Sequence, residues 1–210
     1  MPRLLYIEAS PRKERSASSV VAAAFIEAYR NENAGAFVDV LDLWAKPLPE
    51  FDQAALDAKY AVMGGTSFNA PQKAAWANIE QMTDRLKAAD LIVFSVPMWN
   101  FGIPYKLKHY LDLVMQPGLT FGFEAARGYF GLMTDKKALT IYASGGEYPP
   151  GSPGELMDFQ SRYLNFALKF LGITDLHEIR VAPTLARGPD AAKEVREHAC
   201  VAATRLAATI

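Results

Sequence analysis

The chain has 210 residues, half of them hydrophobic, and its 22 basic and 23 acidic side chains leave a formal net charge of −1. Neither sign forms a long block, so the composition supports neither nucleic-acid binding nor a polybasic membrane surface, and a small-molecule partner is expected. The single cysteine, Cys200, excludes an internal disulfide framework and a cysteine-rich zinc site, and we expect no metal site. No apolar run approaches the ~20 residues of a membrane span, and a signal-peptide core is lacking, so we expect a cytoplasmic protein.

Apolar segments of strand length alternate with segments of helical period, which is typical of βαβ units and a parallel sheet. The length suits one α/β domain covering residues 1–210. The pattern predicts five strands, at residues 4–7, 37–43, 91–96, 138–143 and 173–181. Helices are expected near residues 21–29, 75–89, 104–115, 155–171 and 191–208. Residues 47–70 are predicted to form a surface excursion with a weak helix at 54–60, and 119–132 a small hairpin.

The polar segment after the first predicted strand is the first candidate site, because ligands of doubly wound sheets bind beyond the carboxyl ends of the strands. It places the hydroxyls of Ser10, Ser16, Ser18 and Ser19 before a helix start. Free N–H groups and the positive end of the helix dipole attract an anion there, although serine is also an ordinary helix cap. Because the segment lacks G-x-x-x-x-G-K-[ST] and G-x-G-x-x-G, a single phosphate is favoured over a triphosphate or dinucleotide.

A second candidate loop follows the third predicted strand and reads Pro97-Met98-Trp99-Asn100-Phe101-Gly102-Ile103-Pro104. Two aromatic rings and a thioether offer a large contact area to a flat heterocycle, and an amide can address its ring nitrogens and carbonyls. Simple core packing of the aromatic side chains is the alternative interpretation.

The third candidate loop, Ser144-Gly145-Gly146, follows the fourth predicted strand. Paired glycines let backbone N–H groups approach a ligand without obstruction by side chains. An ordinary turn would use the same residues.

Together the three loops resemble those of the FMN-dependent NADH:quinone oxidoreductases that also act as azoreductases. The resemblance runs through most of the chain and includes Leu107-Lys108 and Leu111-Asp112 after the second loop. It implies a flavodoxin-like, doubly wound five-stranded parallel sheet of order 2-1-3-4-5, and a homodimer with FMN at its interface. The implied FMN contacts are Ser10, Ser16, Ala17 and Ser18 for the phosphate, and Pro97, Met98, Trp99, Asn100, Phe101, Ser144, Gly145 and Gly146 for the flavin.

The resemblance also implies a reaction in two steps, in which NADH or NADPH reduces the flavin and a quinone or azo compound then takes the electrons. No catalytic side chain is required, because the redox chemistry belongs to the flavin. The backbone N–H groups of Gly145 and Gly146 would stabilise the negative charge of the reduced ring. Phe121 and Phe123 would form walls of the acceptor pocket, although hydrophobic packing also explains either residue.

Two positions depart from the family pattern. The family often has Ser-Arg-Gly-Gly where this chain has Ala143-Ser144-Gly145-Gly146, and tyrosine is frequent where this chain has Trp99. The missing arginine removes a cation near the pocket, so neither the choice between NADH and NADPH nor the range of acceptors follows from the resemblance.

A dimer is also predicted from the chain's own residues. Phe159, Tyr163, Phe166 and Phe170 give one predicted helix more aromatic surface than a single inward face readily uses. Such surplus apolar surface commonly marks an interface, although part of it can belong to the core.

Two other classes of protein are compatible with an α/β sheet that carries an anion-binding loop. A low-molecular-weight phosphatase needs a cysteine nucleophile in its anion loop, and the only cysteine here is far away in sequence. An FMN electron carrier or regulatory flavoprotein without nicotinamide turnover shares the fold and stays open as the alternative to an enzyme.

Overall fold

Five parallel strands form the centre of the molecule in the computed structural model, which describes residues 1–210. Their order across the sheet is β2-β1-β3-β6-β7, and all four pairings are parallel. Counted within this sheet alone, that order is 2-1-3-4-5, as expected for a flavodoxin-like arrangement. The strands are β1 (Arg3–Glu8), β2 (Phe37–Asp42), β3 (Leu91–Pro97), β6 (Lys137–Ala143) and β7 (Asp175–Val181).

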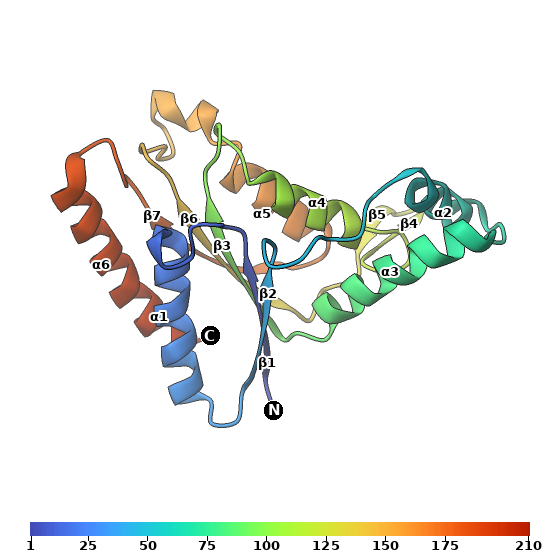
Figure 1. Cartoon of the computed structure of the whole chain (residues 1–210), viewed down its shortest axis with the longest axis horizontal. Coiled ribbons are helices and arrows are strands. Elements are labelled where there is room, and N and C mark those ends of the chain that lie inside the picture. The colour runs from blue at the N-terminus through green and yellow to red at the C-terminus, as the bar shows by residue number, and fades with distance from the viewer.

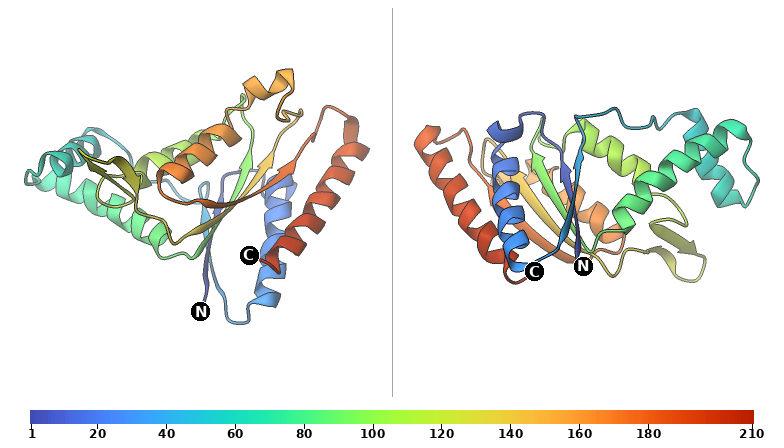
Figure 2. Two further views of the ribbon diagram at one scale, coloured as in Figure 1. Left: turned by 180° about the vertical axis from the view of Figure 1, so that it is seen from behind. Right: turned by 60° about the horizontal axis from the view of Figure 1, so that its bottom comes forward.

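Helices cover both faces of the sheet (Figures 1 and 2). Helices α1 (Ala17–Glu32) and α6 (Gly188–Ala207) pack on one face. Helices α3 (Ala70–Lys87), α4 (Tyr105–Val114) and α5 (Ser161–Phe170) lie on the other.

The apolar run of β3 is explained by these two layers. Leu91 and Val93 belong to the core under α1 and α6, whereas Ile92 and Phe94 belong to the core under α3, α4 and α5. Because successive side chains of a strand point to opposite faces, a strand covered on both sides needs apolar residues throughout. Each such side chain contributes roughly 1.5–3 kcal/mol by its burial.

An arm extends to one side of the sheet, at the right of Figure 1. It contains α2 (Gln53–Gly64), part of α3 and the antiparallel hairpin of β4 (Phe121–Glu124) and β5 (Gly128–Gly131). The hairpin confirms the prediction for residues 119–132. Helix α2 is longer than predicted, because Asp52 caps its start and Gly65, with a φ of 64°, ends it. No helix in the structure combines the length and apolarity needed to cross a membrane.

The helix predicted over residues 155–171 is divided in two, so that prediction was wrong in its first third. A short 3-10 helix, η2 (Pro153–Met157), is followed by a break, and α5 starts only at Ser161. The carboxylate of Asp158 accepts a hydrogen bond from the Ser161 N–H at 2.8 Å, which fixes the start of α5 after the break.

Candidate functional site

The three predicted loops meet at a cavity of about 300 Å³ at the carboxyl edge of the sheet. This edge is where doubly wound folds bind their ligands. The predicted residues that line this small cavity are Ser10, Ser16, Ala17, Pro97, Met98, Trp99, Ser144 and Gly145.

One end of the small cavity is formed by the start of α1. Ser16 is the N-cap of this helix, yet its side chain makes no capping hydrogen bond. The first helical bond runs from the Val20 N–H to the Ser16 carbonyl at 3.0 Å, so the N–H groups of residues 17–19 have no acceptor within the helix. The Ser16 hydroxyl lies 3.2 Å from that of Ser18, and both residues are buried. These donors and the helix dipole suit a phosphate group.

Lys13 fixes the loop that leads into this helix. Its ammonium group bridges Glu8 at 3.0 Å and Asp42 at 2.5 Å, which are the last residues of β1 and β2. Burial lowers the pKa of Lys13, but the two carboxylates outweigh that effect and raise it. The loop is therefore tied to the sheet by a lysine that stays charged.

Three arginines add positive charge around the small cavity. Arg12 and Arg15 come from the loop before α1, and Arg196 comes from α6. None of the three takes part in an ion pair of the chain. Together with the free N–H groups of α1 they make this end of the cavity attractive to an anion.

The second predicted loop forms a tight turn against the sheet. The Met98 N–H donates to the Ala143 carbonyl at 2.7 Å, which attaches the loop to the end of β6. Trp99 and Gly102 exchange two backbone hydrogen bonds of 2.9 Å, with Asn100 and Phe101 between them. We call residues 99–102 the flavin turn, after the flavin contact that the resemblance implies for Trp99, Asn100 and Phe101.

The Trp99 ring is held by two other aromatic side chains. Its centroid lies 5.6 Å from that of Trp44 and 6.4 Å from that of Tyr105. Trp44 is itself fixed, because its indole N–H donates to the Ala9 carbonyl at 3.0 Å. These contacts hold the Trp99 side chain in a defined orientation at the edge of the cavity.

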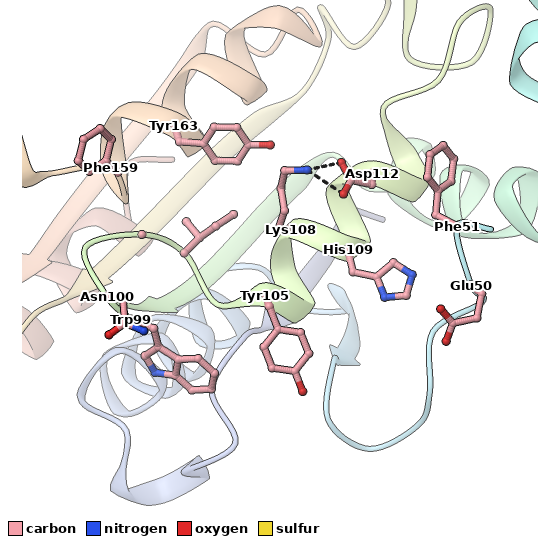
Figure 3. A pocket seen from close by; sticks show the side chains of 12 residues that line it. Glu50, Phe51, Trp99, Asn100, Tyr105, Lys108, His109, Asp112, Phe159 and Tyr163 are labelled. Carbon is pink, nitrogen blue, oxygen red and sulfur yellow. Dashed lines mark hydrogen bonds and ion pairs between the residues drawn. The ribbon is translucent and has the colours of Figure 1, made fainter. Parts of the chain in front are cut away.

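A second, larger cavity of about 790 Å³ shares Trp99 with the small one and is drawn in Figure 3. Asn100 lines this larger cavity and not the small one. Helix α4 contributes an ion pair in which the Lys108 ammonium contacts both oxygens of Asp112, at 2.5 and 2.7 Å. The larger cavity is also lined by Glu50, Phe51, Gly102, Ile103, Tyr105, His109, Phe159 and Tyr163.

The third loop presents unused backbone donors. Neither the Gly145 nor the Gly146 N–H donates a hydrogen bond to the backbone or to a side chain of the chain. The Gly145 carbonyl accepts from Leu185 at 3.1 Å and from Ala186 at 2.9 Å, which fixes the orientation of the loop. A Cβ at Gly145 would meet the Leu185 side chain at 3.1 Å, so the close approach favours glycine.

Several predicted residues do not line the small cavity. Ser18 is fully buried beneath Ser16, Phe101 projects from the turn, and Gly146 lies one residue beyond the lining. The aromatic rings predicted for the acceptor pocket are also elsewhere. Phe121 packs on Phe170 at 5.0 Å in the interior, and Phe123, two residues further along the same face of β4, is 62% exposed.

The structure adds site residues that the sequence reasoning missed. Thr184 and Leu185 follow β7, whose carboxyl end shares the same sheet edge, so the strand pattern could have indicated them. Arg196 lies near the middle of a helix and Glu50 in an irregular segment, and no local pattern marks either one.

This sheet order, with a helix start of free N–H groups beside an aromatic loop at the carboxyl edge, defines a flavodoxin-like protein. A family model described as "flavodoxin-like fold" matches residues 2–206. The chain is 46% identical over 207 residues to an FMN-dependent NADH:quinone oxidoreductase of Nitratidesulfovibrio vulgaris, with 99% of each chain covered. It is 42% identical to FMN-dependent NADH:quinone oxidoreductase 3 of Pseudomonas fluorescens, with 99% and 96% covered. The chain belongs to this flavodoxin-like family, in the group of the FMN-dependent NADH:quinone oxidoreductases and azoreductases.

Solved structures agree with this placement. The azoreductase of Bacillus anthracis superposes with a TM-score of 0.91 at 26% identity over the whole of both chains. An FMN-dependent NADH-azoreductase of the same organism, in complex with FMN, superposes with a TM-score of 0.85 at 27% identity over 99% of this chain and all of the other.

Proposed function

We propose that the chain binds FMN in the small cavity and uses it to transfer electrons from a nicotinamide donor to quinone or azo acceptors. The observation that carries the proposal is the junction of the two cavities at Trp99. A polar, anion-attracting cavity suits the phosphate and sugar chain, and a more open, more apolar cavity that also contacts Trp99 suits a flat substrate. The relatives' names supply the cofactor and the class of reaction.

The residues present fit the cofactor. The phosphate of FMN would be held by the free N–H groups of α1 and the Ser10 and Ser16 hydroxyls, with Arg12, Arg15 and Arg196 nearby. Met98 and Trp99 would contact the ring system, and Ser144 and Gly145 would border it.

When bound, the flavin supplies the redox chemistry, accepting a hydride and passing on its electrons. The protein binds and orients this ring and provides dipoles for the charge that develops on it. The unused N–H group of Gly145, which lines the small cavity, would serve that last role, with the unused N–H group of Gly146 one residue beyond the lining, since fixed donors in a partly closed site need no reorganisation during the reaction. An acceptor in the larger cavity would lie against Trp99, Asn100 and Tyr105 (Figure 3).

Purified protein is expected to bind FMN and to lose its visible flavin absorbance quickly when NADH is added without oxygen. A benzoquinone or azo dye added afterwards should restore the absorbance, because the bound donor has left before the acceptor enters. Stopped-flow spectra of the two half-reactions check this two-step mechanism. A protein that binds FMN but is reduced only by a protein partner would be an electron carrier instead, and a protein that binds no flavin would contradict both.

A homodimer is the second part of the proposal. The rings of Phe123, Tyr129, Phe170 and Phe166 form a chain from the hairpin to α5, with successive centroids 5.0, 5.8 and 6.5 Å apart. Three of them are exposed, with Phe166 at 68%. A single protomer leaves most of this aromatic surface exposed to solvent, which favours a second copy of the chain that covers it.

We expect light scattering to give twice the chain mass, and Phe166→Glu to shift the protein toward the monomer, because a charge would be buried in the apolar interface. Val201→Glu, on the half-exposed outer side of α6, is the matched control and should leave the mass unchanged. A wild-type monomer at all concentrations would disprove the dimer.

A further inference from the structure

The flavin turn is conformationally strained. Asn100 has a φ of 47° and Phe101 a φ of 70°, so both central residues lie in the left-handed region, as a type I′ hairpin turn requires. Asparagine tolerates this region, but the second central position strongly favours glycine, and a bulky aromatic residue there is an outlier. The turn therefore needs support from outside itself.

The support comes from the break between η2 and α5. The Phe159 N–H is shared between the Phe101 carbonyl at 3.1 Å and the carbonyl of Met157, two residues before it, at 3.0 Å. The next residue, Gln160, is 1% exposed, and its side-chain amide donates to the Val96 carbonyl at 2.9 Å. Residues 158–160, which we call the brace, thus hold the loop both where it leaves β3 and at the strained residue.

The brace is anchored to the sheet by Asp158. This carboxylate is 3% exposed and accepts hydrogen bonds from the Ser161 N–H at 2.8 Å and from the Arg180 guanidinium on β7 at 3.0 Å. Arg180 also donates to the Ser161 hydroxyl at 2.8 Å. Burial alone would raise the pKa of Asp158, but these hydrogen bonds outweigh it and keep the pKa below its usual value. The anchor is thus an ionised carboxylate within a closed polar cluster.

Packing of the Phe159 side chain does not explain the break. The ring is 62% exposed, so its burial contributes little, whereas its backbone N–H is used on the flavin turn. A continuous helix from residue 155, which the sequence pattern predicts, would have used that N–H within the helix. The break therefore makes the donor available to Phe101.

We propose that Asp158 is a positioning residue that acts through the brace to hold Phe101 in its left-handed conformation, and so fixes the flavin turn before the cofactor binds. The role of the turn in flavin binding rests on the proposed function, whereas the coupling between brace and turn does not. A glycine at position 101 would adopt the same backbone without support, so the need for the brace follows from the side chain at that position.

The test is a double-mutant cycle of Asp158→Asn and Phe101→Gly, measured by FMN titration and by urea unfolding of the FMN-free protein. In the wild-type background, Asp158→Asn is expected to weaken FMN binding about tenfold, because the anchored turn loosens. In the Phe101→Gly background, Asp158→Asn should change the affinity for FMN by less than about threefold, because a glycine adopts the left-handed backbone without support from the brace. The effects of the two substitutions should therefore not add. The urea midpoint should show the same non-additivity without any flavin.

Glu178→Gln is the matched control. Glu178 also contacts Arg180 but touches neither the brace nor the turn, so its effect should be equal in both Phe101 backgrounds. If Asp158→Asn does not fold, Gln160→Met replaces it, because it keeps the volume and removes the donor to Val96.

Equal effects of Asp158→Asn in both backgrounds would overturn the positioning role, even if FMN binds tightly. Non-additive urea midpoints in a protein that binds no flavin would support the brace while refuting the proposed function.

Discussion

Replacing Ser16 by aspartate is expected to weaken FMN binding by at least about 100-fold and riboflavin binding by no more than about threefold. Ser16 lines the small cavity at the start of α1, where the phosphate is proposed to bind. Two unit charges 4 Å apart repel by about 4 kcal/mol at an effective dielectric constant of 20, which exceeds the roughly 2.7 kcal/mol that a 100-fold loss requires. Riboflavin has the same ring and sugar chain without the phosphate, so the ratio of the two losses isolates the anion site.

Ser16→Asn is the matched control, because it has nearly the same shape as aspartate without the charge. Both residues are favoured helix caps, so urea unfolding should show neither variant to be less stable than wild type. Ser16 is a sharper position for this test than Ser18, which is fully buried and does not line the cavity. If FMN and riboflavin lose affinity equally while the fold stays intact, the phosphate is bound elsewhere.

The sequence predicts the sheet well because burial on two faces leaves a clear pattern. The apolar run of β3 and the helical spacing of α1 and α3 each report a local requirement that the fold imposes on consecutive residues. The break at Asp158 leaves no such pattern. Its cause is a set of hydrogen bonds to Arg180 and to Phe101, which are distant in the chain, and the flanking aromatic residues keep the spacing of a helix.

The candidate site likewise contains some residues that a local sequence pattern predicts and others that depend on contacts between distant parts of the chain. Ser16, Met98 and Gly145 were predicted because each follows a strand that ends at one edge of the sheet, and topology brings such loops together. Arg196 and the larger cavity depend on how α6, α4 and the segment around Glu50 pack, which no local pattern encodes. Phe121 and Phe123 line neither cavity, since the packing of the hairpin against α5, and not the strand pattern, decides how far each ring on this face of β4 is buried.

Replacing Gly131 by alanine is expected to lower the free energy of unfolding by about 3 kcal/mol or more, because the added methyl group has no space. A Cβ at this position would lie 2.1 Å from the Gly172 nitrogen and 2.2 Å from the Leu171 carbonyl carbon. Both atoms are backbone, and the Met133 N–H bond to the Leu171 carbonyl at 2.8 Å holds the two segments together. The hairpin cannot move away without losing this bond and the contact of Phe121 with Phe170.

Gly122→Ala on the paired strand is the control that separates backbone from side-chain crowding. The three atoms nearest to its Cβ would all belong to the Phe130 ring, the first at 2.4 Å, and that half-buried side chain can rotate away. We therefore expect Gly122→Ala to change the free energy of unfolding by less than about 1 kcal/mol, although the two glycines lie on neighbouring strands of one hairpin. Urea unfolding of the FMN-free protein measures both variants. Equal losses of unfolding free energy in the two variants would show that the hairpin is generally intolerant of added volume. The close approach of Gly131 to Gly172 would then not be what fixes the hairpin to the end of α5.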